Sequence, residues 1–338
     1  MNPTQPIQPL LTRREINVVE PLSPAFERVK LMLFRPFDLG KWFAIGFCAW
    51  LACLGEAGSG SGFGGNSNWG KHSGQTGTDI HRDLDQAKDW LLNNLDWLIP
   101  VAAFLIVVLL GLGLLCLWLN SRGKFMFLHC VALNRAEVTA PWNKFGPEAN
   151  SLFWFQLGLC FIGMILMLPM LGMIAVIVLE MVYHGEPEVG GIVTATGLAL
   201  VFFLMAIAFG IIKKFTADFI VPIMYLRRSK CLAAWKEFYR LLTAHFWQFV
   251  LYFLFQIVLS MVIGMVVMLV MIVTCCFCCL MLVPFIGTVL LLPVLVFKRS
   301  YPLYFLAQFG PEYDVFPPPA APVPAPGLPP MPAAPPVM

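Results

Sequence analysis

The stretch LDWLIPVAAFLIVVLLGLGLLCLWL, residues 95–119, decides the fold. Its only charged residue, Asp96, stands at one end. A helix of this length rises about 38 Å at about 1.5 Å per residue, which exceeds the roughly 30 Å hydrocarbon core of a bilayer. The run shows no period-2 alternation, so it predicts a transmembrane helix rather than a strand of a membrane barrel.

Five further apolar stretches predict transmembrane helices by the same argument. The 338-residue chain is 59% hydrophobic and 12% charged, whereas about 25% of the residues in soluble domains are charged. This composition excludes a soluble domain and a disordered protein. We therefore predict an all-α, polytopic transmembrane bundle of about six spans. The other five spans are 40–54, 152–182 with Pro169 inside it, 191–212, 246–274 and 279–297.

Lysine and arginine are divided unevenly between the two sides of these spans. Nineteen of the 22 fall in the terminal segments and in the loops after the second and fourth spans. Only Lys71, Arg82 and Lys88 fall on the opposite side, together with nine carboxylates. The positive-inside rule then predicts that both termini are cytoplasmic. Residues 1–22 contain no apolar signal-peptide core, so we expect a multi-pass protein of the bacterial inner membrane.

The basic cytoplasmic side predicts a partner. Anionic lipid head groups attract a basic surface by up to about 1 kcal/mol per well-placed cation, so membrane lipids are the expected partners at this face. The simpler alternative is that the cations only set the topology. We expect no nucleic-acid partner, and membrane-protein partners are left open.

Two segments of the chain match at a constant offset of 93 residues. Trp142 and Phe145 precede the aromatic pair Phe153–Trp154, and Trp235 and Phe238 precede the pair Phe246–Trp247. A looser copy begins near Ala25. Each copy places an amphipathic segment before a span that starts with aromatic residues, which suit the membrane boundary.

The repeat predicts three units within a membrane domain of residues 22–300. Each unit consists of an interfacial helix and a hairpin of two spans, and the units cover about 22–119, 120–213 and 214–297. Because two spans return the chain to the same side, successive units keep one orientation. This is a parallel repeat rather than the inverted repeat of many transporters.

Aromatic and small residues recur at the start of the units. They are Ala25, Phe26, Val29, Leu33, Phe34, Pro36 and Phe37, then Ala234, Trp235 and Phe238, and then His245, Phe246 and Trp247. In this arrangement residues 22–300 resemble uncharacterised bacterial multi-span membrane families, and in particular the membrane domain fused to glycerophosphodiester phosphodiesterases. The resemblance implies a membrane module. The phosphodiesterase domain itself has no counterpart in this chain.

Three segments outside the spans have biased composition. Residues 1–21 are polar and proline-rich, and we expect them to be disordered. The outside loop 55–78 is rich in Gly and Ser, as flexible coils are. We expect residues 301–338 to form a disordered tail, proline-rich from Pro317 on. Such a tail can bind aromatic grooves, although its Pro and Ala content fits a spacer better.

A group of four cysteines lies between the fifth and sixth spans: Cys275, Cys276, Cys278 and Cys279. Thiolates gathered there could bind Cu(I) or zinc, or could form a labile disulfide on the oxidising side of the membrane. Cysteine is also a common small apolar residue in buried helices, and packing is the interpretation that we favour. We therefore assign no catalytic, cofactor-binding or metal-binding residue. We expect no cofactor and no enzymatic activity.

The span centres contain no Asp, Glu, Lys or Arg, although such residues usually mark ion and proton pathways. Gln248 and Gln256 are the main amide groups within a span. Ala206 with Gly210, and Ser260 with Gly264, are small-residue pairs that predict close helix packing. We expect a structural, lipid-interacting or partner-binding module. The alternative is a transporter or channel for an uncharged or lipid-like substrate, which a polar cavity at Gln256 or Pro169 would favour.

Overall fold

The computed structural model describes residues 16–35, 37–54, 90, 93–184, 189–273 and 284–316. Within these residues every regular element is helical, which confirms the predicted all-α class. The outside loop 55–78, the four clustered cysteines and the tail beyond residue 316 lie outside the described residues. The elements are α1 (Leu22–Val29), η1 (Lys30–Phe34), α2 (Leu39–Cys53), α4 (Leu95–Leu133), α5 (Thr139–Lys144), α6 (Gly146–His184), α7 (Val189–Phe215), η2 (Thr216–Ile220), α8 (Val221–Arg227), α9 (Cys231–Ala244), α10 (Phe246–Val273), α12 (Pro284–Leu290), α13 (Leu292–Ala307) and η3 (Pro311–Tyr313).

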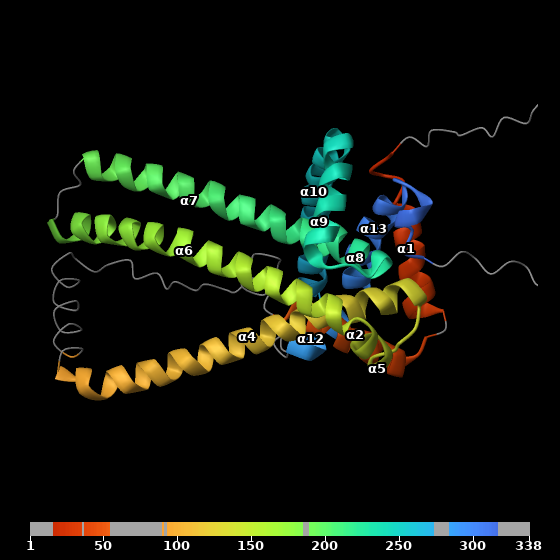
Figure 1. Cartoon of the computed structure of the whole chain (residues 1–338), viewed down its shortest axis with the longest axis horizontal. Helices are drawn as coiled ribbons and strands as arrows, with labels where there is room; N and C mark the ends of the chain where they lie inside the picture. Colours follow the sequence, from red (N-terminus) through yellow and green to blue (C-terminus); the bar gives the residue numbers. More distant parts are fainter. Residues whose placement is uncertain are drawn as a thin grey trace, which may run out of the picture.

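The packed core lies where the short helices surround one end of each long helix, a region that we call the helical head (Figure 1). The ring of Phe219 in η2 lies near its centre. The ring centroids of Phe238, Phe249, Tyr252 and Phe305 lie between 5.0 and 6.2 Å from it. All five side chains are fully buried. Four separate helical elements are thus held together by one aromatic cluster, and offset or edge-to-face contacts of this kind add to the stability gained by burial.

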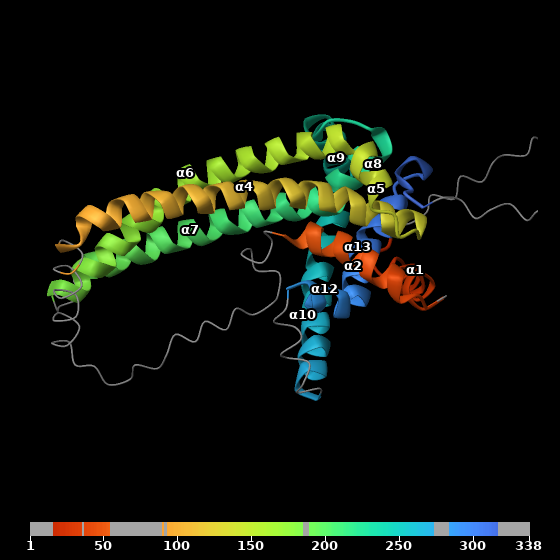
Figure 2. The same ribbon diagram turned by 90° about the horizontal axis from the view of Figure 1, so that it is seen from below.

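Among the residues that the structure describes, four helices are long and apolar enough to cross a membrane: Leu95–Leu133, Gly146–Glu180, Val189–Arg227 and Phe246–Leu269. None of the residues in the most apolar stretches of the first three helices is buried, and 11% of those in the fourth are buried. Figure 1 shows α4, α6 and α7 extending from the helical head in one direction. Figure 2 shows α10 leaving the head across that direction. An apolar surface of this extent requires lipid or protein to cover it.

Each of the four long helices is exposed along its apolar part and buried at one end. In α4 the change falls at Asn120, where the exposed run ends and a buried run begins that reaches Ala132. This helix of 39 residues rises about 58 Å, nearly twice the thickness of the hydrocarbon core. It therefore continues past the predicted span 95–119 and forms part of the helical head.

The predicted first and sixth spans correspond to shorter elements. The first corresponds to α2, an apolar helix of 15 residues. The sixth corresponds to α12 and α13, which are separated at Leu291. Since Pro293 follows this break at the start of α13 and lacks an amide hydrogen, the helix restarts there. Six spans and three repeats are thus not established by the structure.

The helical head extends into the predicted disordered tail. Helix α13 continues to Ala307, and Tyr313 is buried. The hydroxyl of Tyr301 donates a 2.8 Å hydrogen bond to the carbonyl of Val18. The structure differs from the prediction between residues 301 and 316 because aromatic side chains such as Tyr301 and Phe305 are fully buried there.

Candidate functional site

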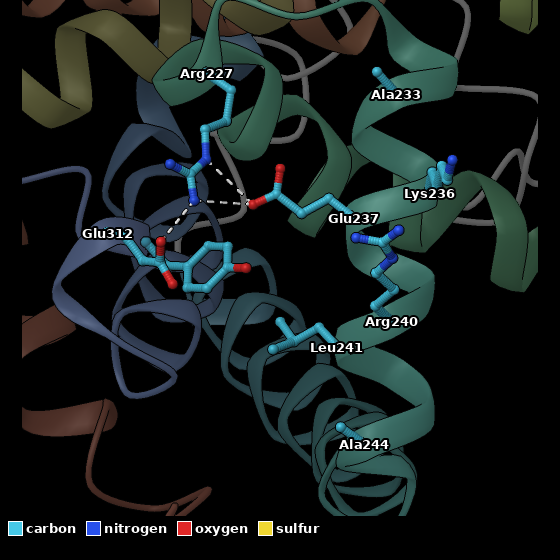
Figure 3. A pocket seen from close by; sticks show the side chains of 9 residues that line it. Arg227, Ala233, Lys236, Glu237, Arg240, Leu241, Ala244 and Glu312 are labelled. Atoms are coloured by element: carbon cyan, nitrogen blue, oxygen red, sulfur yellow. Dashed lines mark hydrogen bonds and ion pairs between the residues drawn. The ribbon is translucent and has the colours of Figure 1, made fainter.

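An open pocket of about 610 Å³ lies on the helical head beside α8, α9 and η3 (Figure 3). Helix α9 supplies most of its wall because the helix is amphipathic. It buries Cys231, Ala234 and Phe238 and exposes the opposite face. The residues that line the pocket are Arg227, Ala233, Lys236, Glu237, Arg240, Leu241, Ala244, Glu312 and Tyr313.

Charged side chains from three elements meet in this pocket. The Nη2 atom of Arg227 lies 3.1 Å from Oε1 of Glu237 and 2.8 Å from Oε2 of Glu312, and Figure 3 shows the guanidinium between the two carboxylates. Lys236 and Arg240 are exposed and have no ion-pair partner among the residues that the structure describes. With three cations and two carboxylates, the pocket carries a net positive charge and can accept an anion.

Tyr313 contributes a neutral polar group to the same pocket. Burial raises the pKa of its phenol, and the Glu237 carboxylate raises it further. The phenol therefore stays protonated at neutral pH and is able to donate a hydrogen bond. The Arg227 guanidinium lies 5.7 Å from the centre of the Tyr313 ring, which holds the two side chains together.

A buried polar network lies deeper, where η2 meets α10. Asp218, 6% exposed, is the acceptor at its centre. Its Oδ2 atom lies 2.9 Å from Nζ of Lys214 and accepts a 2.9 Å hydrogen bond from the hydroxyl of Tyr252. The side-chain amide of Gln256 donates a 3.1 Å hydrogen bond to that same hydroxyl. The π-helical turn η2 places Asp218 inside the helical head, and such turns are frequent at functional sites.

A lateral groove of about 550 Å³ opens next to this network, between α7 and α10. The residues that line it are Ile207, Gly210, Ile211, Lys214, Phe253, Gln256, Ile257, Ser260 and Met261. It contains a small residue from each of the two predicted packing pairs, Gly210 and Ser260. No atom lies within 4 Å of a Cβ built on Gly210 or on Gly264. In the described structure these pairs leave open space, so the prediction that they hold the helices together is wrong.

A third group of polar side chains lies between α2, α4 and α8. The Nδ1 atom of His129 lies 2.9 Å from the hydroxyl of Tyr225, and its Nε2 lies 3.9 Å from a carboxylate oxygen of Glu137. The Sγ atoms of Cys48 and Cys130 lie 3.9 Å apart, both buried as free thiols. These residues hold the helical head together, and the sequence alone did not indicate this arrangement.

The sequence-predicted residues are only partly brought together. Gln256 reaches the polar network and the groove, whereas Pro169 lies in an exposed part of α6 that lines neither described pocket. Cys275, Cys276, Cys278 and Cys279 lie outside the described residues. Within the described part of the chain, no group of three or more His, Cys, Asp or Glu side chains is placed to hold a metal ion. Asp218 was missed because it follows the predicted fourth span and looks like a loop residue in the sequence.

Long apolar helices that converge on a helical head define a helical protein of the membrane-protein class. The chain belongs to the family of unknown function DUF7544, which matches residues 16–296. No curated protein matches the chain, and no solved structure does either. The predicted relation to phosphodiesterase-fused membrane domains therefore stays a prediction.

Proposed function

We propose that this protein is a non-enzymatic integral protein of the bacterial inner membrane, with its helical head on the cytoplasmic side, where it binds anionic lipid head groups. The long helices provide the anchorage, and the basic pocket on α9 provides the recognition of lipid. Both termini are cytoplasmic in this proposal.

One observation carries the proposal. The positive-inside rule assigns the C-terminal ends of α4 and α7 and the N-terminal ends of α6 and α10 to one side of the membrane. The helical head buries residues at these ends of α4, α6 and α10, and it buries the turn η2 that directly follows the end of α7. The exposed apolar part of each helix then starts where the head ends. The burial pattern and the charge pattern therefore support the same orientation for α4, α6 and α7, which extend from the head in one direction, whereas α10 leaves it across that direction.

The proposal includes six spans in three units. A short helix precedes an apolar helix three times in the structure: α1 with η1 before α2, α5 before α6, and α9 before α10. This order supports an interfacial helix followed by a hairpin in each unit. The 93-residue offset between Trp142 and Trp235 also supports the three units. These two residues lie in α5 and α9.

The contact with lipid head groups rests on Lys236 and Arg240. They lie four residues apart, so they share one face of α9, and both are exposed beside the pocket. The same helix exposes Leu232 and Tyr239, at 73% and 64%. An amphipathic helix with exposed apolar and basic side chains is typical of the membrane surface.

Lipid competition tests this assignment. The full chain is purified in mild detergent, incubated with equal amounts of phosphatidylglycerol and phosphatidylcholine, and analysed by native mass spectrometry. We expect preferential retention of phosphatidylglycerol, and a loss of about fivefold in that preference for each of Lys236→Ala and Arg240→Ala. Lys230→Ala and Arg135→Ala, exposed cations that do not line the pocket, are the controls. Equal loss in both sets, or no preference in the unaltered chain, contradicts the assignment.

The second candidate function is transport of an uncharged or lipid-like substrate. The observation that favours it is the groove between α7 and α10, which Gln256 lines. This groove lies beside Lys214, at the predicted cytoplasmic end of α7, so it provides a binding position rather than a path across the bilayer. Proteoliposomes containing a fluorescent lipid distinguish the two candidates. Faster movement of the lipid between leaflets than in empty vesicles favours transport.

A further inference from the structure

We propose that the groove between α7 and α10 binds one acyl chain of an anionic phospholipid, with the lipid head group held at Lys214 and Gln256. This inference deepens the proposed function and rests on its membrane insertion, but it concerns a different surface from the basic pocket on α9. The groove has an apolar lining, an amide at Gln256 and a cation at Lys214.

The groove has the shape and the lining that an acyl chain requires. Its walls are apolar side chains from both helices, with Ile207 and Ile211 on α7 and Phe253, Ile257 and Met261 on α10. Gly210 and Ser260 provide the depth, since a larger side chain at either position would occupy the space. The volume of about 550 Å³ falls within the range of ligand sites, roughly 300–1,000 Å³. Because both helices are apolar membrane-span candidates, lipid is the occupant that surrounds them.

Gln256 indicates a polar ligand at one end of the groove. The side chain is 6% exposed and lines the groove. Its amide nitrogen donates to Tyr252, whereas its carbonyl oxygen accepts no hydrogen bond from any residue that the structure describes. A hydroxyl of a lipid head group can donate a hydrogen bond to this carbonyl oxygen.

Lys214 specifies the charge of the ligand. Its side chain is 38% exposed and lines the groove, and its ammonium pairs with Asp218 at 2.9 Å. An ammonium has three donors, so two remain for a phosphate. The adjacent Lys213 is exposed, and the two cations together outweigh the single Asp218 carboxylate. Both lie at the predicted cytoplasmic end of α7, the depth at which the phosphates of the inner leaflet occur.

Photolabelling tests the site in the full chain. The protein is reconstituted into nanodiscs with phosphatidylglycerol that carries a diazirine in one acyl chain, and labelled peptides are mapped by mass spectrometry. We expect stronger labelling of residues 207–214 and 253–261 than of the exposed α4 segment 104–110. Labelling of that α4 segment requires only that the protein is inserted in the membrane. A matched diazirine phosphatidylcholine should give weaker enrichment at the groove, and Lys214→Gln should abolish the difference between the two lipids.

Two glycine variants on α7 make the test specific. Gly210→Leu fills the groove, whereas Gly197→Leu adds the same side chain to the same helix at a position that is equally open, with no atom within 4 Å of the added Cβ. We expect Gly210→Leu to lower labelling of the groove to the α4 level and Gly197→Leu to leave it unchanged. Equal labelling of the groove in both variants overturns the inference. Labelling of α4 without enrichment at the groove refutes the groove site alone, whereas absence of labelling on α4 refutes membrane insertion.

Discussion

The hydroxyl of Tyr252 donates a 2.9 Å hydrogen bond to the carboxylate of Asp218. It joins the base of α10 to the π-helical turn η2, and both side chains are buried. Lys214 pairs with the same carboxylate oxygen. This contact fixes the point where one long apolar helix enters the helical head, and it borders the groove that we assign to a lipid.

Tyr252→Phe removes this hydrogen bond while keeping the ring. It leaves a buried carboxylate with one donor fewer, and we expect a loss of about 1.5–3 kcal/mol in the free energy of unfolding. In detergent this should lower the apparent Tm by roughly 3–8 °C. Tyr239→Phe, at a tyrosine that is 64% exposed on α9, is the control and should leave the Tm unchanged. Equal Tm values for the two variants would show that the hydrogen bond contributes nothing to stability.

Gly123→Ala tests the packing of α2 against α4. A Cβ at residue 123 would lie 2.5 Å from the backbone nitrogen of Ala52, so the two helices must move apart. We expect a destabilisation of about 1–3 kcal/mol, as is typical of overpacked cores. Gly111→Ala is the control on the same helix, with no atom within 4 Å of the added Cβ, and should stabilise by up to about 1 kcal/mol. Thermal unfolding in detergent measures both changes. A Gly123→Ala variant that unfolds at the same temperature as the unaltered chain would contradict the close packing of α2 against α4.

The thiol of Cys231 should be unreactive in the folded protein. Burial raises its pKa to about 12, so at pH 8 the reactive thiolate is on the order of one part in 10,000. Burial also blocks access, because Cys231 is 1% exposed. We expect iodoacetamide to modify it only after denaturation, as measured by peptide mass spectrometry. A cysteine introduced by Leu232→Cys, at a position that is 73% exposed, should react under native conditions. Rapid native alkylation of Cys231 would mean that α9 does not pack as described.

The sequence predicted the long helices well and their mutual contacts poorly. Length and apolar composition are sufficient to locate α4, α6, α7 and α10 because the hydrocarbon core imposes both. The same uniform composition hides which face of each helix packs. The contact between Asp218 and Tyr252 joins two helices across 34 positions of the chain, and no local pattern reports it. Gly210 and Ser260 were expected to bring helices together, and in the structure they line open space.

The sequence-based prediction also underestimated how much of the chain belongs to the helical head. Predicted loops after the second and fourth spans proved to be helical continuations, namely the end of α4 and the turn η2 followed by α8. Lys214 and Arg227 in these segments set the predicted orientation, but in the folded protein they also bind carboxylates. A sequence shows the charge of such residues and not the partners that tertiary packing gives them.

We propose that the helical head is cytoplasmic and that α4, α6 and α7 cross the membrane from it. Alkaline phosphatase fusions at successive positions of the full chain test it most directly, because the enzyme is active only outside the cytoplasm. We predict active fusions after residue 75 and near residue 186, and inactive fusions near residues 140 and 230, with expression matched by immunoblot. An active fusion near residue 140, in α5 of the helical head, would contradict this orientation.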